Sequence, residues 1–410
     1  MERFWMKNIL VIGGGFAGVW SAAAAVRAAR AHGVPQSELQ VTVVSSGDDL
    51  VIRPRLYESD PEEKRVALDR VLGPIGVRRI AATVIGIDTT TRTVNAVDRS
   101  GRDTVLSYDR LVLASGSQVV RPTIPGAQWI FDVDTLDAAT SLDHHLRRLP
   151  QRASTPGSFT AVVIGAGFTG LEVATELTGR LRDLAGEAAD VRVVLVERAD
   201  AVGPELGEGP RPHISSALHD LGVEVRLGKT VDRVTENEVE LSDGELIPAS
   251  TVIWTAGMAA SPLTQDIPAE RDRHGRLRVD EFLRVRGVPG VFAAGDTAAA
   301  AAEEGQTVMQ SCQHAIPLGK FAGHNVAADA IGLELARFAP NPYVTCLDLG
   351  PAGAVVTTGW DRVVEKTGDQ GKALKRQINA EWIYPPVDDA DAILELADHE
   401  DTWSMEEVTA

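Results

Sequence analysis

Residues 10–20 read LVIGGGFAGVW, and residues 161–172 repeat the pattern as AVVIGAGFTGLE. In each copy a β-branched run ends in the spacing Gly-x-Gly-x-x-Gly and continues into a helical pattern. This order predicts a buried strand, a tight turn and a helix. The glycines let the backbone approach a pyrophosphate at the positive end of the helix, so each copy predicts a dinucleotide site. A glycine-rich turn without a ligand is the alternative. The motif glycines are Gly13, Gly15 and Gly18 in the first copy and Gly165, Gly167 and Gly170 in the second.

The two copies also agree beyond their turns. Gly18 lies 27 residues before Ser45 at the end of LQVTVVS, and Gly170 lies 27 residues before Glu197 at the end of VRVVLVE. A hairpin-like segment and a further apolar run follow in both copies. The pattern therefore indicates an internal duplication of a βαβ unit with an inserted β-hairpin.

This duplication predicts an α/β fold with two Rossmann-like dinucleotide-binding domains, each with an inserted β-hairpin. We expect the first domain to be discontinuous, over 1–120 and 285–335, and the second to cover 121–284. The Pro/Ser/Gly-rich segment 149–158 has no apolar period and is expected to be a linker. Beyond it, YVTCLDLG and AGAVVTTGW alternate like antiparallel strands, which predicts a C-terminal α+β interface domain over 336–410 with an acidic tail.

The net charge of the protein restricts the kinds of partner that it can bind. The net charge is −18, and residues 388–407 carry nine acidic residues without Lys or Arg. This balance disfavours nucleic acid and anionic membrane surfaces. The uncharged stretch 9–26 has the length of a membrane span, but three consecutive glycines favour a strand followed by a helix, so we expect no stable membrane insertion.

Two cysteines, Cys312 and Cys346, are 34 residues apart. This spacing is neither a local metal motif nor a disulfide framework, which favours a reducing compartment. MERFWMKN continues directly into the first predicted strand, so we expect no signal peptide and a cytoplasmic protein.

The strand-end residues of the two copies differ. Glu197 places a carboxylate where it would accept the ribose hydroxyls of an adenosine, which favours NADH over NADPH. Arg198 beside it could still accommodate a 2′-phosphate, and a solvated strand end is the alternative for Glu197. Ser45 stands at the matching place of the first copy, where its hydroxyl offers a weaker hydrogen bond.

The order GGGFAG, LVLASG, VIGAGFTGLE, VIWTAG and VFAAGD resembles the two-dinucleotide flavoprotein superfamily that includes the pyridine nucleotide-disulfide oxidoreductases. The resemblance covers 8–330 and implies FAD in the first domain and NAD(P)H in the second. Asp296 matches the aspartate that binds the ribityl and pyrophosphate region of the flavin. The positions implied for cofactor binding are Gly13, Gly15, Phe16, Ala17, Gly18, Ser45, Arg53, Ala114, Gly116, Gly165, Gly167, Phe168, Thr169, Gly170, Glu197, Ala256, Gly257, Gly295 and Asp296.

The redox-active cysteine pair of the disulfide reductases is absent after the first domain's second strand. RPRLYE and MQSCQHAIPLGKFAGHN instead look like the branch that contains type II NADH dehydrogenases. Two features depart from that branch. The quinone-proximal Ala-Gln-x-Ala reads Met309-Gln310-Ser311-Cys312, and the tail is acidic rather than basic or apolar.

Few side chains are expected to take part in the chemistry, because the flavin performs the difficult step. Gln310 and Gln313 flank the start of a helix predicted from about Ser311, where they would donate hydrogen bonds near the flavin. Glu172 matches a glutamate that, in this family, lies near the nicotinamide–flavin contact. A first-turn Glu favoured by the helix dipole is the alternative.

Other charged residues are less specific. Arg53 and Arg55 would contact phosphate or acceptor, or form an exposed basic loop. Four histidines without partner spacing are expected at the surface: His144, His145, His213 and His274.

The resemblance implies an FAD-dependent NADH oxidoreductase that passes electrons to a quinone-like small molecule, and a homodimer is compatible with it. A ferredoxin-like protein or a specific biosynthetic metabolite is the alternative acceptor. An apoptosis-inducing-factor-like binding protein that responds to NADH is the alternative of another class.

Overall fold

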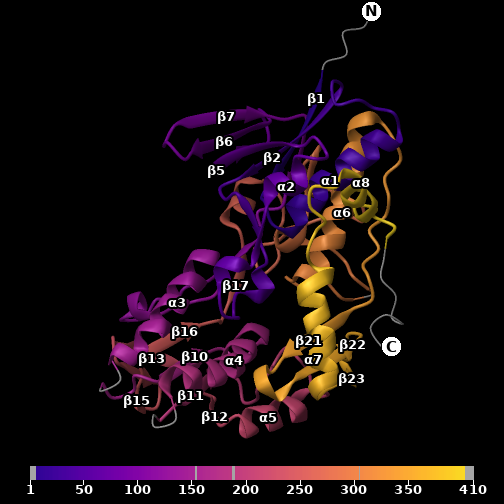
Figure 1. Cartoon of the computed structure of the whole chain (residues 1–410). Coiled ribbons are helices and arrows are strands. Elements are labelled where there is room, and N and C mark those ends of the chain that lie inside the picture. Colours follow the sequence, from indigo (N-terminus) through magenta and orange to yellow (C-terminus); the bar gives the residue numbers. More distant parts are fainter. Residues whose placement is uncertain (1–5, 153–154, 187–189, 304, 402–410) are drawn as a thin grey trace, which may run out of the picture.

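The computed structural model describes residues 6–152, 155–186, 190–303 and 305–401. It is a mixed α/β structure with two main sheets, and in each of them one central strand leads through a glycine turn into a helix (Figure 1). Seven of the nine acids of the tail are described, and the other two, Glu406 and Glu407, lie outside the described residues.

The first sheet has seven strands in the order β19-β8-β1-β2-β5-β6-β7. Its first five members pair in parallel, and β6 and β7 add an antiparallel meander. The strands are β1 (Lys7–Ile12), β2 (Leu39–Ser45), β5 (Arg78–Asp88), β6 (Thr93–Asp98), β7 (Asp103–Ser107), β8 (Arg110–Leu113) and β19 (Val291–Ala293).

Two helices, α1 (Phe16–Ala31) and α6 (Cys312–Ile331), pack tightly against each other beside this sheet. Their backbones approach so closely that a methyl group at Gly319 would lie 2.6 Å from the carbonyl oxygen of Ala17. The uncharged stretch 9–26 is therefore a buried strand followed by a buried helix, as predicted. In the described part of the chain, no helix is both long and apolar enough to cross a membrane.

The second sheet is parallel and has the order β12-β11-β10-β16. Helices α3 and α4 contribute to its core, and the predicted hairpin of EVELSDGELI is present as β14 and β15. The elements are α3 (Leu136–Arg148), β10 (Thr160–Ile164), α4 (Phe168–Ala185), β11 (Arg192–Glu197), α5 (Arg211–Asp220), β12 (Val223–Leu227), β13 (Val231–Val234), β14 (Glu238–Leu241), β15 (Leu246–Pro248) and β16 (Thr251–Trp254).

The chain beyond residue 336 contacts both the part built around the first sheet and the part built around the second sheet. The antiparallel strands β21 (Val344–Asp348), β22 (Ala354–Thr358) and β23 (Val363–Lys366) pack with α7 (Gly368–Gln377) beside α4, whereas α8 (Ala390–Leu396) returns to α1 (Figure 1). The alternation of YVTCLDLG and AGAVVTTGW thus forms the antiparallel pair that it predicts.

Short elements complete the fold. The antiparallel pair β9 and β17 links the segments that follow β8 and β16. The remaining short strands and helix are β3 (Asp49–Val51), β4 (Arg65–Ala67), α2 (Leu68–Leu72), β9 (Ser117–Val119), β17 (Met258–Ala260), β18 (Leu277–Arg278) and β20 (Ala298–Ala299).

Candidate active site

The first glycine turn combines tight packing with one open position. Gly13 has a φ of +119°, and a methyl group at Gly18 would lie 2.0 Å from the carbonyl oxygen of Gly13. Nothing lies within 4 Å of a Cβ built at Gly15, the N-cap of α1, and no side chain caps this helix. The positive end of α1 therefore faces open space, which suits a phosphate.

The second turn repeats this arrangement. Gly165 has a φ of +104°, and a methyl group at Gly170 would lie 1.7 Å from the carbonyl oxygen of Gly165. Gly167 caps α4 without a side-chain hydrogen bond and is again open. Both turns have the stereochemistry that a bound dinucleotide requires.

Residues around the first turn fit a flavin nucleotide. Asp296 accepts a hydrogen bond from the Ser117 hydroxyl at 2.6 Å and lies 3.6 Å from the Arg53 guanidinium. Burial raises the pKa of Asp296, against the opposing effects of Ser117 and Arg53. The Ser115 hydroxyl is buried without a partner in the described residues, so it remains available to a ligand.

The other positions assigned to the flavin lie around the same turn. Phe16 and Ala17 begin α1 and are buried, and the carbonyl oxygen of Ala114 lies against Gly13. Ser45 ends β2, where its hydroxyl would contact a side chain at Gly14. Gly116 and Gly295 both adopt positive φ values in the loops beside it.

The second turn is held by Glu197 at the end of β11. This residue is buried, and its carboxylate accepts hydrogen bonds from the backbone N–H of Ala166 at 2.7 Å and of Ala199 at 2.9 Å. Glu197 is thus not a solvated strand end. Its carboxylate anchors the turn itself and retains acceptor capacity toward a ribose.

Further predicted positions surround this turn. Thr169 is exposed and Phe168 is half-buried in the first turn of α4. Ala256 lies against Gly165, and Gly257 follows it toward β17.

A buried ion pair involves Glu172, and its partner escaped the sequence analysis. Lys375 of α7 donates to the Glu172 carboxylate at 2.8 Å, and the N–H of Asp348 donates to the same oxygen at 3.1 Å. Burial raises the pKa of Glu172. Burial opposes the charge on Lys375, yet the neighbouring carboxylate raises the pKa of Lys375. Glu172 is therefore more than a helix-dipole residue, and it joins α4 to the C-terminal strands.

The two glutamines at the start of α6 are engaged with main chain. The Gln310 amide donates to the carbonyl of Asp296 at 3.3 Å, and the Gln313 amide donates to the carbonyl of Pro342 at 3.0 Å. Ser311 caps the helix as its N-cap residue. Only Gln310 is thereby tied to the Asp296 loop.

Arg53 and Arg55 do not form an exposed basic loop. Arg53 pairs with Asp134 and donates to the Ser117 hydroxyl at 2.9 Å. Arg55 forms a bidentate contact with Glu58 and reaches the Tyr384 hydroxyl at 3.1 Å. Both arginines therefore connect elements that are distant in sequence.

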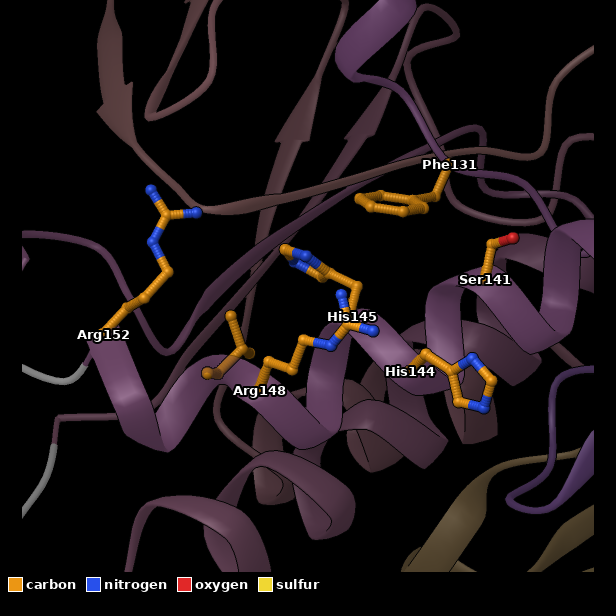
Figure 2. Close-up of a pocket in the computed structure, with 7 residues that line it drawn as sticks. Phe131, Ser141, His144, His145, Arg148 and Arg152 are labelled. Atoms are coloured by element: carbon orange, nitrogen blue, oxygen red, sulfur yellow. The ribbon is translucent and has the colours of Figure 1, made fainter.

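The surface prediction is confirmed for His144 and His213, which are exposed, whereas His274 is half-buried and so is His145. Its ring lies 4.5 Å from that of Phe131, and its Nε2 lies 2.9 Å from the hydroxyl of buried Thr251. Burial lowers the pKa of His145. It lines a hollow of about 410 Å³ along α3, together with His144 and Arg148 (Figure 2). This hollow lies where β16 begins, whereas the glycine turn lies at the opposite, carboxyl edge of the sheet.

The described part of the acidic tail contacts α1 and α6 through two ion pairs. Asp398 pairs with Arg27 of α1, and Asp401 pairs with Lys320 of α6 at 3.0 Å. The ring of His399 lies 3.9 Å from that of His324. Together with Asp388, which pairs with Arg70, three of the seven acids that the structure describes in the tail have a basic partner.

The comparisons with known proteins agree with this geometry. Residues 7–319 match the family described as pyridine nucleotide-disulphide oxidoreductase. The chain is 46% identical over 392 residues to the NADH dehydrogenase-like protein MT1860 of Mycobacterium tuberculosis, covering 95% of this chain and 97% of the relative. It is 28% identical to the demethylphylloquinone reductase NdbB of Synechocystis, over 85% of this chain and 86% of the relative.

Solved structures share the fold. The NDH2 of Plasmodium falciparum, solved with NADH, matches with a TM-score of 0.76 at 13% identity and covers 96% of this chain and 97% of its own. The matching turns, the Asp296 loop and these relatives imply a flavin and a nicotinamide cofactor. The chain belongs to the pyridine nucleotide-disulphide oxidoreductase family, as a flavoprotein oxidoreductase of the type II NADH dehydrogenase-like branch.

Proposed function

We propose that this protein is an FAD-dependent NADH oxidoreductase that reduces a quinone-like small molecule. The observation that carries the proposal is the pair of matching turns, each open at one position, Gly15 and Gly167. Two dinucleotides on one chain allow one to supply a hydride and the other to receive it. Bound FAD supplies both the hydride acceptor for NADH and the electron donor for the second substrate.

The residues of the first half would hold the FAD. The turn at Gly15 and the N-terminus of α1 would bind its pyrophosphate, and Asp296 with the free Ser115 hydroxyl would bind its polar chain. Gln310, which contacts the Asp296 loop, would donate toward negative charge near the start of α6.

The residues of the second half would hold NADH. The Gly167 turn would bind the pyrophosphate, and Glu197 would accept ribose hydroxyls. A buried carboxylate at this place repels a 2′-phosphate, so we propose a preference for NADH over NADPH. The Glu172–Lys375 pair would keep two opposite charges buried together beside α4.

A quinone-like acceptor is supported by the relatives. The Synechocystis protein is a demethylphylloquinone reductase, and a type II NADH:quinone oxidoreductase of M. tuberculosis is 30% identical over 58% of this chain. The net charge of −18 disfavours an acidic protein acceptor, because like charges slow the encounter. We also propose a cytoplasmic enzyme without stable membrane insertion; a homodimer stays a prediction.

The test is a reduction and reoxidation experiment. The purified protein should be yellow with about one FAD per chain, and NADH should bleach it rapidly under anaerobic conditions. Quinones, ferricyanide, a ferredoxin and oxygen are then compared as oxidants. Rapid reoxidation by quinones alone supports the proposal. Rapid reoxidation by ferredoxin alone identifies a protein acceptor, and slow bleaching with a long-lived charge-transfer band identifies an NADH-responsive binding protein.

A further inference from the structure

Arg362, just before β23, is a buried guanidinium without a counter-ion. It is 6% exposed, and in the part of the chain that the structure describes it forms no ion pair with a carboxylate. Its Nη1 is buried and makes no hydrogen bond among the described residues. Its Nη2 makes one long contact, 3.4 Å to the carbonyl oxygen of Glu205. Such an uncompensated charge is costly in a protein interior.

Aromatic rings compensate this charge only in part. The guanidinium carbon lies 4.6 Å from the ring centroid of Tyr343 and 5.7 Å from that of Phe168. A guanidinium above a ring gains cation–π attraction through its flat face. Its N–H donors lie in its own plane and are not used by that contact. The contacts therefore hold Arg362 in place while leaving a donor free.

Arg362 lies beside the second dinucleotide site. Phe168 is the first residue of α4, immediately after the open position Gly167. On its other side Arg362 packs against the loop after β11, where a methyl group at Gly209 would lie 2.7 Å from its carbonyl oxygen. The segments that follow β10 and β11 form the carboxyl edge of the sheet, where ligands bind in open α/β folds. The guanidinium thus reaches this edge from the C-terminal strands.

The backbone of Arg362 is also strained. Its φ is +58°, a left-handed conformation that residues other than glycine adopt rarely. Arg362 is the last residue of the turn between β22 and β23, a position that often takes this conformation in hairpins. The turn therefore fixes the place at which the unpaired guanidinium is held.

We propose that Arg362 recognises the pyrophosphate of the nicotinamide dinucleotide, so that the C-terminal strands form part of the NADH site. The inference rests on the proposed function and adds one residue to the proposed NADH site. The pyrophosphate is the anionic part of NADH, and it would lie at the open N-terminus of α4, next to Phe168. The guanidinium fork matches the geometry of phosphate oxygens. A bound pyrophosphate would supply both the missing counter-charge and the missing acceptor.

The test compares ADP-ribose with adenosine by titration calorimetry on the flavin-loaded full-length protein. ADP-ribose contains the pyrophosphate, and adenosine does not. Arg362→Met should weaken ADP-ribose binding by about tenfold or more, the loss expected for one charge-assisted hydrogen bond, and should leave adenosine binding unchanged. Arg337→Met is the matched control, because Arg337 lies 5.9 Å from the ring of Phe282 but is exposed and distant in the fold from α4. It should alter neither affinity.

The remaining outcomes separate binding from folding. Equal ADP-ribose affinity in Arg362→Met and wild type, or equal weakening of both ligands, would overturn the role in pyrophosphate recognition. If the Met variant does not fold, Arg362→Lys keeps the charge but loses the fork, and a selective loss of ADP-ribose affinity in it supports the proposal. A Lys variant with wild-type affinity for ADP-ribose overturns it. A wild-type protein that binds neither ADP-ribose nor NADH refutes the proposed function itself.

Discussion

Replacing Lys375 by Met should destabilise the folded protein, because it leaves the buried charge of Glu172 without a partner. The two groups are 2.8 Å apart, and their side chains are 9% and 11% exposed. Breaking a buried ion pair by removing one partner destabilises proteins by about 3–5 kcal/mol, because the other charge is left uncompensated. We expect Lys375→Met to lower the free energy of unfolding by about this amount at pH 8. The double variant Glu172→Gln/Lys375→Met should recover most of the loss, since no charge is then left behind.

The loss of stability caused by Lys375→Met should be larger at high pH than at low pH. Burial raises the pKa of Glu172 in the native state, and removal of Lys375 takes away an opposing effect. The native state of the variant therefore binds a proton more tightly than the unfolded state, so stability is gained below the native pKa and lost as pH rises through it. The penalty of Lys375→Met should shrink as pH falls from 8 toward 5.

The measurement is urea unfolding of the flavin-loaded proteins at a fixed excess of FAD, because bound ligand contributes to the measured free energy. A penalty below about 1 kcal/mol, or one that does not change with pH, would refute the assignment of Lys375 as the counter-charge. A double variant that is no more stable than the single variant would refute it as well.

Four further outcomes are expected. Gly167→Ala should keep the wild-type melting temperature, because nothing lies within 4 Å of the added methyl group, but should raise KM for NADH by about tenfold or more; an unchanged KM would show that the space is not used. Glu197→Gln should narrow the NADH/NADPH ratio of kcat/KM by about tenfold; with an unchanged ratio, the carboxylate only anchors the turn. Gln310→Leu should slow acceptor reduction by roughly tenfold in stopped-flow experiments while NADH still bleaches the flavin; the reverse pattern would place this residue on the nicotinamide side. Burial and neighbouring His399 lower the pKa of His324 to about 4. A proton therefore binds more tightly to His324 when the segment around His399 has left α6. Contact between this segment and α6 should accordingly weaken as pH falls from about 6.5 toward 4. Proteolysis of the segment around His399 should increase over this range and do so less in His399→Phe; cleavage that is independent of pH would contradict the argument.

The sequence predicts the parts of the fold that depend on local order. A β-branched run, a glycine spacing and a helical pattern occupy adjacent positions, so both turns and their helices are found where they are predicted, including the start of α6 after Ser311. The uncharged stretch 9–26 was separable from a membrane span for the same reason, because its glycines interrupt any helix.

The rest depends on contacts between distant positions. Lys375 lies 203 residues after Glu172, and nothing in the spacing of charges relates them. Arg362 belongs to a polar loop, and its burial arises only when the C-terminal strands pack against α4. His145 has no partner at a local spacing, and the residues that partly cover it, Phe131 and Thr251, come from other parts of the chain.

The strand order of the first sheet has a consequence for the order of folding during synthesis. Strand β19 pairs with β8, and Phe292 on β19 is fully buried, so the sheet that begins at residue 7 needs residue 293 to be complete. All four strands of the second sheet lie between residues 160 and 254. As the chain leaves the ribosome, the second sheet can therefore close while the first still lacks an edge strand and α6. Nascent chains arrested near residue 290 should accordingly protect the second sheet from proteases and leave the first sheet open to cleavage. Of the two sheets, the one whose first strand is made first would thus be completed second.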